Sequence, residues 1–216
     1  MWAIVPIKAL ETAKRRLADV LCPEERRALM LAMARDVLTA LCRCRALRGV
    51  LIVSRTPEAD ALAQAFGTER FAESPDADLS SALRQAAEHL RDHLGATGVM
   101  VVPADVPLID ADEIDRILAG HDAVTVIPDD EELGTNGLVC TPPTRIPFTF
   151  DGRSFRPHVE AAAAAGTTAR VVHSPRFALD IDTPDDLRAL LRRGAGTQTA
   201  VFLQKSGIAQ RLNPEP

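Results

Sequence analysis

The sequence predicts one α/β domain with a mainly parallel central sheet flanked by helices. Apolar runs typical of strands alternate with helical patterns almost from the first residue, as they do in parallel sheets. The 216 residues are 46% hydrophobic and 25% charged, a balance typical of one soluble globular domain. No repeat or second apolar core stands out. We therefore expect a domain over residues 1–193 and, over residues 194–216, a C-terminal arm or tail that packs on the domain or a partner or is partly disordered.

Six short apolar runs are the expected strands. They cover residues 2–7, 50–53, 99–102, 123–127, 137–140 and 169–173. In open α/β sheets ligands bind beyond the carboxyl ends of the strands. The loops that follow Ile7, Val53 and Val102 are therefore the expected place of a site.

Six amphipathic or capped segments are the expected helices. They cover residues 23–45, 57–66, 79–94, 110–119, 154–165 and 183–193. The first begins with Pro23 and two acidic residues and ends among arginines, as the helix dipole favours. The third repeats apolar residues at helical spacing. The last has Thr183 as its N-cap and Pro184 at its first position.

Charge is divided unevenly along the chain. Residues 1–50 hold 10 basic and 5 acidic side chains, whereas residues 101–150 hold 2 basic and 10 acidic ones. A uniformly basic chain would favour nucleic acid as a partner. A basic segment beside an acidic one instead favours phosphate held by cations and a metal held by carboxylates. We therefore expect no nucleic-acid partner.

We expect a cytoplasmic protein from its lack of targeting signals and from its cysteines. No run approaches the roughly 18 apolar residues that cross a membrane. Residues 1–10 are too short, and too soon charged at Lys8, for a secretion signal. The four cysteines include no C-x-x-C pair, so we expect reduced thiols. A membrane partner is not expected.

The first strand–helix loop is basic and has no glycine. No glycine precedes Gly49, which excludes the P-loop and the G-x-G-x-x-G fingerprint from this turn. Lys8, Lys14, Arg15 and Arg16 crowd the loop instead. Such cations can neutralise a triphosphate, arginine as a bidentate fork and lysine as a point charge. The alternative is a solvated, basic start of a helix.

Two acidic segments are candidates for a magnesium site. Asp105 follows the most apolar strand in V-V-P-A-D-V-P-L, and Asp180 and Asp182 lie in L-D-I-D-T-P-D-D-L. In a strand-like D-x-D both carboxylates point the same way. Mg²⁺ is satisfied by one or two carboxylates and substrate phosphate oxygens. The alternatives are a loop or capping role for Asp105 and a capping role beside the last helix for Asp182.

These motifs together resemble the guanylyltransferases that make the deazaflavin coenzyme F-420. That family is a branch of the nucleotidyltransferase superfamily and is related to the molybdenum-cofactor guanylyltransferases. The resemblance covers residues 2–191 and rests on five segments in order, P-x-K-x-x-x-x-A-K-x-R-L, D-V-P-L, G-T-N-G-L, F-D-G-R-S-F and L-D-I-D-T-P-D-D-L. Most of the superfamily has a glycine-rich first loop, which this chain lacks. The resemblance implies a Rossmann-like, GT-A-like nucleotidyltransferase domain.

The resemblance also implies roles for particular residues. It assigns catalysis to Lys14, Arg16 and Asp105, nucleotide binding to Lys8, Lys14, Arg16 and Ser80, acceptor binding to Thr135, Gly152 and Ser154, and Mg²⁺ binding to Asp105, Asp180 and Asp182. Many members have F-G-x-G-S where this chain has Asp151 and Arg153 around Gly152. Where relatives have G-L-N-x-A, Asp78 and Ser80 replace the glycine and the asparagine.

The implied reaction joins GTP to a small phosphorylated carboxylic acid and releases pyrophosphate. The acid is 2-phospho-L-lactate, phosphoenolpyruvate or 3-phospho-D-glycerate, and the residues alone leave the choice open. A homodimer and a hand-over of the product to a deazaflavin transferase are the partners that this function would involve. The alternatives are a nucleotidyltransferase with another acceptor, such as molybdopterin, and a nucleotide-binding module without catalysis.

Overall fold

The computed structural model describes residues 1–7, 14–74 and 76–212. Its sheet has seven strands in the order β3-β2-β1-β4-β6-β5-β7. The strands are β1 (Trp2–Pro6), β2 (Gly49–Ser54), β3 (Glu69–Ala72), β4 (Val99–Val101), β5 (Val124–Pro128), β6 (Thr135–Cys140) and β7 (Arg170–Val171). The helices are η1 (Arg15–Leu17), α1 (Pro23–Arg43), α2 (Pro57–Phe66), α3 (Leu79–Leu94), α4 (Ala111–Ala119), α5 (Phe155–Ala164), α6 (Pro184–Arg193), α7 (Gln198–Lys205) and α8 (Ile208–Leu212).

The sheet is mainly parallel, as the sequence predicts. β1 pairs in parallel with both β2 and β4. β2 also pairs in parallel with β3, and β5 pairs in parallel with β7. β6 is the exception, because it runs antiparallel to β4 on one side and to β5 on the other. The start of β6 therefore lies at the same edge as the ends of β1 and β4.

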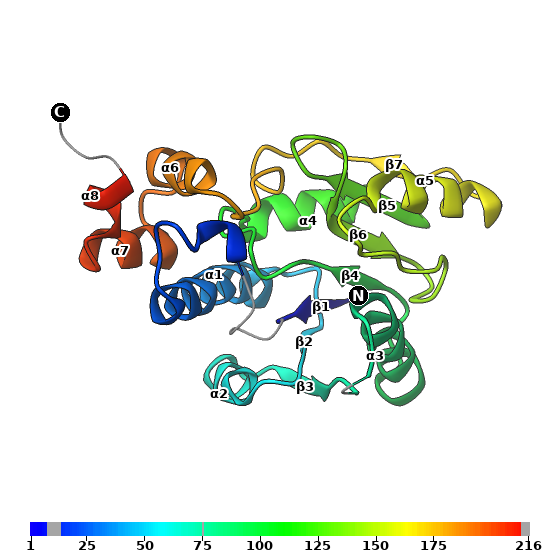
Figure 1. The fold of residues 1–216 in the computed structure, drawn as a ribbon. Coiled ribbons are helices and arrows are strands. Elements are labelled where there is room, and N and C mark those ends of the chain that lie inside the picture. Colours follow the sequence, from blue (N-terminus) through cyan, green and yellow to red (C-terminus); the bar gives the residue numbers. More distant parts are fainter. Residues whose placement is uncertain (8–13, 75, 213–216) are drawn as a thin grey trace.

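Helices cover both faces of the sheet and bury two apolar layers. One layer lies under α1, α2, α4, α6, α7 and α8 and includes Leu38, Ile114 and Leu187. The other lies under α3 and α5 and includes Leu83 and Ala162. Figure 1 shows α1 and α3 on opposite sides of β1. The expected α/β domain is confirmed.

Most expected helices have the expected ends. α1 begins at Pro23, where the Cys22 backbone N–H donates to Glu25 Oε2 at 2.9 Å. α6 begins at Pro184, and the Thr183 hydroxyl accepts from the Asp186 N–H as a helix cap. All four cysteines are free thiols. Among the described residues, no helix combines the length and apolar character that a bilayer span requires.

Four elements, η1, β3, α7 and α8, were not predicted. β3 is an edge strand whose residues are all exposed or half-buried, so it has no apolar run to indicate it. α7 and α8 lie in the expected C-terminal arm. Asp36 of α1 accepts hydrogen bonds from the backbone N–H groups of Gln198 and Thr199, both at 2.8 Å. Leu203 and Leu212 are buried in the core, so the described part of the arm packs on the domain beside α1 and α6 (Figure 1).

Candidate active site

The candidate active site lies at the carboxyl ends of β1 and β4. Lys14 follows β1 and Asp105 follows β4, and the two strands are parallel neighbours. In the antiparallel pair Val101 of β4 lies opposite Leu138 of β6. The first residues of β6 therefore reach the same edge, and they come from the predicted G-T-N-G-L segment.

Lys14 joins the two acidic segments that the sequence singles out. Its Nζ donates to Asp105 Oδ2 at 2.6 Å and to Asp182 Oδ1 at 2.5 Å. The lysine side chain is 6% exposed, and its backbone has the left-handed φ of 55°. Burial lowers the pKa of Lys14, but the charges of Asp105 and Asp182 outweigh burial and raise this pKa above its ordinary value. Lys14 is therefore a permanent cation at neutral pH.

The D-I-D segment is fixed against the loop that carries Asp105. Its buried centre, Ile181, donates its backbone N–H to the Asp105 carbonyl at 3.0 Å. The segment is irregular, although a strand-like conformation was expected. Both of its carboxylates nevertheless lie near Lys14 and Asp105, a group that we call the Lys14 cluster. Asp186 accepts from the backbone N–H groups of Asp182 and Thr183 at 3.0 and 2.7 Å. The start of α6 thus fixes Asp182 beside Lys14.

Asn136 of β6 completes this cluster, and the sequence motifs had not marked it as a site residue. Its Nδ2 donates to Asp180 Oδ1 at 3.1 Å and to the Phe177 carbonyl at 2.8 Å. Burial, together with the charges of Asp105 and Asp182, raises the pKa of Asp180 despite this hydrogen bond. The signal that could have found Asn136 is its place in G-T-N-G-L, beside Thr135.

The carboxylates fit a cation that also binds phosphate. No three acidic, histidine or cysteine side chains form a metal cage within the described part of the chain. Three carboxylates share one ammonium here, because Lys14 contacts Asp105 and Asp182 while Asp180 is held by Asn136. Mg²⁺ normally uses one or two protein carboxylates and takes its other ligands from phosphates and water. Asp105, Asp180 and Asp182 therefore fit Mg²⁺ bound together with a phosphorylated substrate.

The predicted acceptor residues form a second group on the other face of β6. Successive strand residues point to opposite faces, so Thr135 faces α5 whereas Asn136 faces Asp180. The loop before α5 crosses the start of β6, because the Phe155 N–H donates to the Leu133 carbonyl at 3.0 Å. Ser154 is 2% exposed at the N-cap of α5, and Gly152 has a φ of 88°. Thr135, Gly152 and Ser154 therefore lie in adjoining segments.

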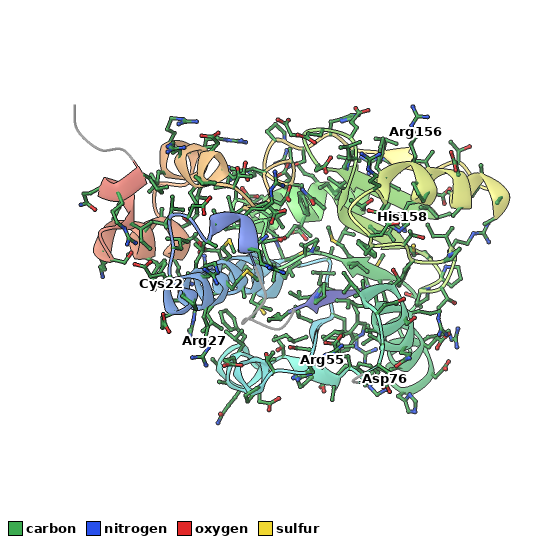
Figure 2. The ribbon with its side chains drawn as sticks, in the orientation of Figure 1. Cys22, Arg27, Arg55, Asp76, Arg156 and His158 are labelled. Atoms are coloured by element: carbon green, nitrogen blue, oxygen red, sulfur yellow. The ribbon has the colours of Figure 1, made fainter. Side chains whose placement is uncertain are left out.

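His158 links this second group, and sequence reasoning missed it. The ring is fully buried, with Nδ1 3.0 Å from Thr135 Oγ1 and Nε2 3.0 Å from the Thr149 backbone nitrogen. In Figure 2, Arg156 extends outward from α5, whereas His158 lies inside the molecule. The only signal in the sequence is its place one helical turn after Ser154.

The binding roles of the remaining predicted residues, Ser80, Arg16 and Lys8, stay predictions. Ser80 accepts a hydrogen bond from the Phe150 N–H at 2.9 Å, which ties the start of α3 to the loop before α5. Arg16 is exposed on η1, two residues after Lys14. Lys8 lies outside the described residues.

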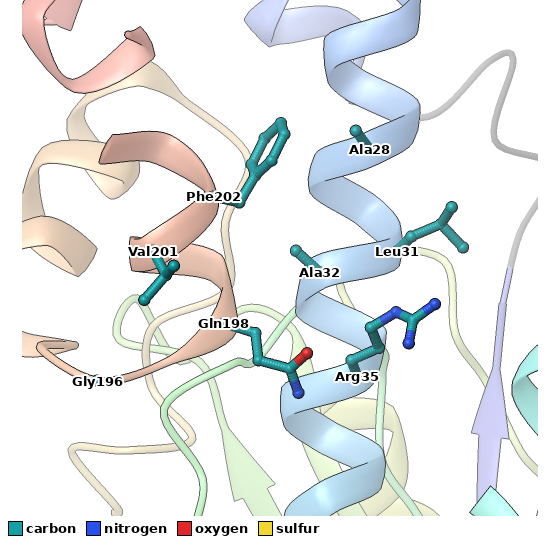
Figure 3. Close-up of a pocket in the computed structure, with 8 residues that line it drawn as sticks. All are labelled: Ala28, Leu31, Ala32, Arg35, Gly196, Gln198, Val201 and Phe202. Carbon is teal, nitrogen blue, oxygen red and sulfur yellow. The ribbon is translucent and has the colours of Figure 1, made fainter. Parts of the chain in front are cut away.

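An open groove of about 460 Å³ lies elsewhere, between α1 and α7. Figure 3 shows its lining residues, Ala28, Leu31, Ala32, Arg35, Gly196, Gln198, Val201 and Phe202. It contains none of the predicted site residues, and its lining is largely apolar. The Lys14 cluster, which holds the predicted acidic residues, therefore remains the candidate site.

The fold is that of a nucleotidyltransferase-like α/β domain. In structure the chain is similar to a protein described as a nucleotide-diphospho-sugar transferase from Desulfovibrio desulfuricans G20, with a TM-score of 0.77 and 19% identity over 98% of this chain and 97% of that one. This likeness shows the fold alone.

The chain belongs to the guanylyl transferase family described as "Guanylyl transferase CofC like", whose model matches residues 1–215. It is 40% identical to the phosphoenolpyruvate guanylyltransferase of Rubrobacter xylanophilus over 92% of this chain and 96% of the relative. It is 32% identical to the 2-phospho-L-lactate guanylyltransferase of Methanobrevibacter ruminantium over 96% of this chain and 92% of the relative. The resemblance of the five motifs to the coenzyme F-420 guanylyltransferases is confirmed.

Proposed function

We propose that this guanylyltransferase transfers the guanylyl group of GTP to the phosphate of a small phosphorylated carboxylic acid, for coenzyme F-420 biosynthesis. Phosphoenolpyruvate is our first candidate, because the 40% identical relative carries that name and the relative named for 2-phospho-L-lactate is 32% identical. 3-Phospho-D-glycerate is the third candidate. The observation that carries the proposal is the bridge from Lys14 to Asp105 and Asp182.

The reaction requires no side chain that removes a proton from the nucleophile. A phosphate oxygen of the acid, already ionised near neutral pH, attacks the α-phosphorus of GTP. A new phosphorus–oxygen bond forms, the bond between the α-phosphorus and the bridging oxygen breaks, and pyrophosphate leaves with that electron pair. Catalysis then depends on positioning and on neutralising charge.

The residues present divide these tasks between them. Lys14 keeps a positive charge at the edge of the sheet where the triphosphate would lie, and Arg16 and Lys8 would add charge from the same loop. Asp105 and one or both of Asp180 and Asp182 would hold Mg²⁺. A bound Mg²⁺ supplies charge neutralisation to the attacking and leaving oxygens. Thr135, Gly152 and Ser154 would hold the acid, and Ser80 the nucleoside.

Mass spectrometry of the products tests the proposal directly. The protein is incubated with GTP, Mg²⁺ and all three acids in competition. We expect one guanosine diphospho-acid and an equal amount of pyrophosphate. If no acid releases pyrophosphate, the proposal is wrong, and a panel with molybdopterin then tests the alternative acceptor.

Asp105→Asn tests the assignment of the site. We expect turnover to fall at least about 100-fold with the fold intact by circular dichroism, because Asp105 would no longer hold the Mg²⁺ that stabilises charge in the transition state. Asp112→Asn is the matched control, since Asp112 is an 85% exposed acid from the same acidic stretch. Unchanged turnover in Asp105→Asn would remove Asp105 from the site. Calorimetry with GTP, with and without EDTA, separates the enzyme from a binding module, which would bind GTP equally in both.

A further inference from the structure

The buried ring of His158 receives a hydrogen bond that fixes its tautomer. The Thr149 backbone N–H lies 3.0 Å from Nε2, and an amide N–H can only donate. Nε2 must therefore carry a lone pair. In a neutral imidazole the proton then resides on Nδ1, which lies 3.0 Å from Thr135 Oγ1.

The ring stays neutral in the folded protein. Burial lowers the pKa of His158 to about 4, and the charge of Asp151 offsets only part of this effect. The ring also packs on Phe150, with 5.0 Å between the ring centres. The ring is therefore held as one neutral tautomer by its contacts at Nδ1 and at Nε2.

This tautomer determines whether the Thr135 hydroxyl donates or accepts the hydrogen bond with His158. Because His158 Nδ1–H donates to it, Thr135 Oγ1 is an acceptor in that contact and its own proton is left for another partner. A carboxylate or phosphate oxygen of the acid is the kind of acceptor that such a proton would bind. In the opposite tautomer the Thr135 hydroxyl would donate its proton to His158 Nδ1 and could not donate to a substrate.

His158 also fixes the loop that precedes Gly152. The N–H groups of Thr149 and Phe150 are consecutive, and they donate to His158 Nε2 and Ser80 Oγ at 3.0 and 2.9 Å. Residues 149 and 150 are thus held from α5 on one side and from α3 on the other.

We propose that His158 is a positioning residue that orients the Thr135 hydroxyl as a hydrogen-bond donor to the phosphorylated acid and so sets the affinity for that acid. The inference rests on the proposed function, because Thr135 is its acceptor residue. His158 itself is not expected to touch either substrate.

Two substitutions separate the two hydrogen bonds of the ring. His158→Asn places an amide N–H near the position of Nδ1 and keeps a donor for Thr135. His158→Gln places its amide group near the position of Nε2 and loses the donor. We expect His158→Gln to raise the KM for the acid about tenfold, the effect of one hydrogen bond, with the KM for GTP within about twofold. His158→Asn should restore most of the KM for the acid.

The outcome is decided by this difference between substrates. If His158 had a purely structural role, each variant would change the KM for GTP as much as the KM for the acid, or both variants would lower the melting temperature equally. Equal KM values for the acid in the two variants, or a parallel rise in the KM for GTP, would overturn the proposal.

Nitrogen NMR of the histidine-labelled wild-type protein tests the tautomer without any variant. We expect a protonated Nδ1 and an unprotonated Nε2, and a shift of the Nδ1 signal when the accepted acid is added with Mg²⁺. Each of the three acids is added in turn. A proton on Nε2, or no shift with any acid, refutes the inference even if the protein folds poorly after substitution. Failure of the proposed function shows separately, as absence of pyrophosphate release by the wild-type protein.

Discussion

Acidification should destabilise the folded protein through His158. The ring is fully buried, and burial lowers its pKa to about 4 from the ordinary value of 6.5. The perturbation is a fall in pH from about 7 to about 4, which protonates the ring in the unfolded chain first.

The size and sign of the effect follow from these two pKa values. Above about pH 6.5 the ring is neutral in both states and contributes no difference. Between about pH 6.5 and 4 the unfolded chain binds a proton that the folded protein does not bind, so stability falls as the pH falls. At about 1.4 kcal/mol per pKa unit, the complete loss is about 3 kcal/mol.

Urea unfolding at several pH values measures this loss. The free energy of unfolding is compared between the wild type and His158→Asn, so that other titrating groups cancel. The wild type should lose about 3 kcal/mol more than the variant between about pH 7 and 4. His93→Asn, which removes an exposed histidine, is the control for loss of an imidazole as such. A difference between wild type and His158→Asn that stays constant over the whole range would refute the reasoning.

Two further predictions concern packing. Asp36→Ala should lower the free energy of unfolding by about 2 kcal/mol and increase hydrogen exchange in α7, because the buried Thr199 loses its charged acceptor; Arg43→Ala, an exposed change at the end of α1, is the control, and unchanged exchange in α7 would contradict the prediction. Gly137→Ala should destabilise the protein by about 1–3 kcal/mol, because the added Cβ would lie 2.6 Å from Ile127 Cδ1. Adding Ile127→Val removes that methyl group and should recover part of the loss, whereas additive losses would show that the clash is not the cause.

The strongest sequence signals lay where one element buries a continuous apolar surface. α1 and α3 have long amphipathic patterns, and β1 and β2 are nearly fully buried runs, so local sequence is enough to find them. β3 has the opposite character, because an edge strand with no fully buried residue shows no such run. α8 is five residues long, too short for a helical pattern to be recognised.

Strand direction could not be predicted from the same signals. All six residues of β6 are buried, as in the parallel strands beside it. A buried run has the same appearance in either direction, and only pairing with β4 and β5 sets it. Yet this direction brings Thr135 and Asn136 to the edge where Asp105 lies.

The candidate site shows the same division. Asp105, Asp180 and Asp182 were predicted because each follows or precedes a recognisable element, and the structure gathers all three around Lys14 and Asn136. His158 was missed because its role depends on Thr135, a residue 23 positions earlier on another element. A single histidine on a helix carries no sign of such a partner.

The charge of the cluster connects the two halves of the site. Lys14 lies on two of the three aspartates, and the third, Asp180, is held by Asn136 and has a raised pKa because it is buried near the other charges. One ammonium cannot balance three carboxylates, so the free site favours a further cation. GTP and a phosphorylated acid would add negative charge at the same edge, which Arg16 and Lys8 would offset in part and for which we propose Mg²⁺ as the further cation. Because Asn136 and Thr135 are adjacent on β6 and face opposite sides of it, this strand connects the Lys14 cluster on one face to the His158 contact on the other.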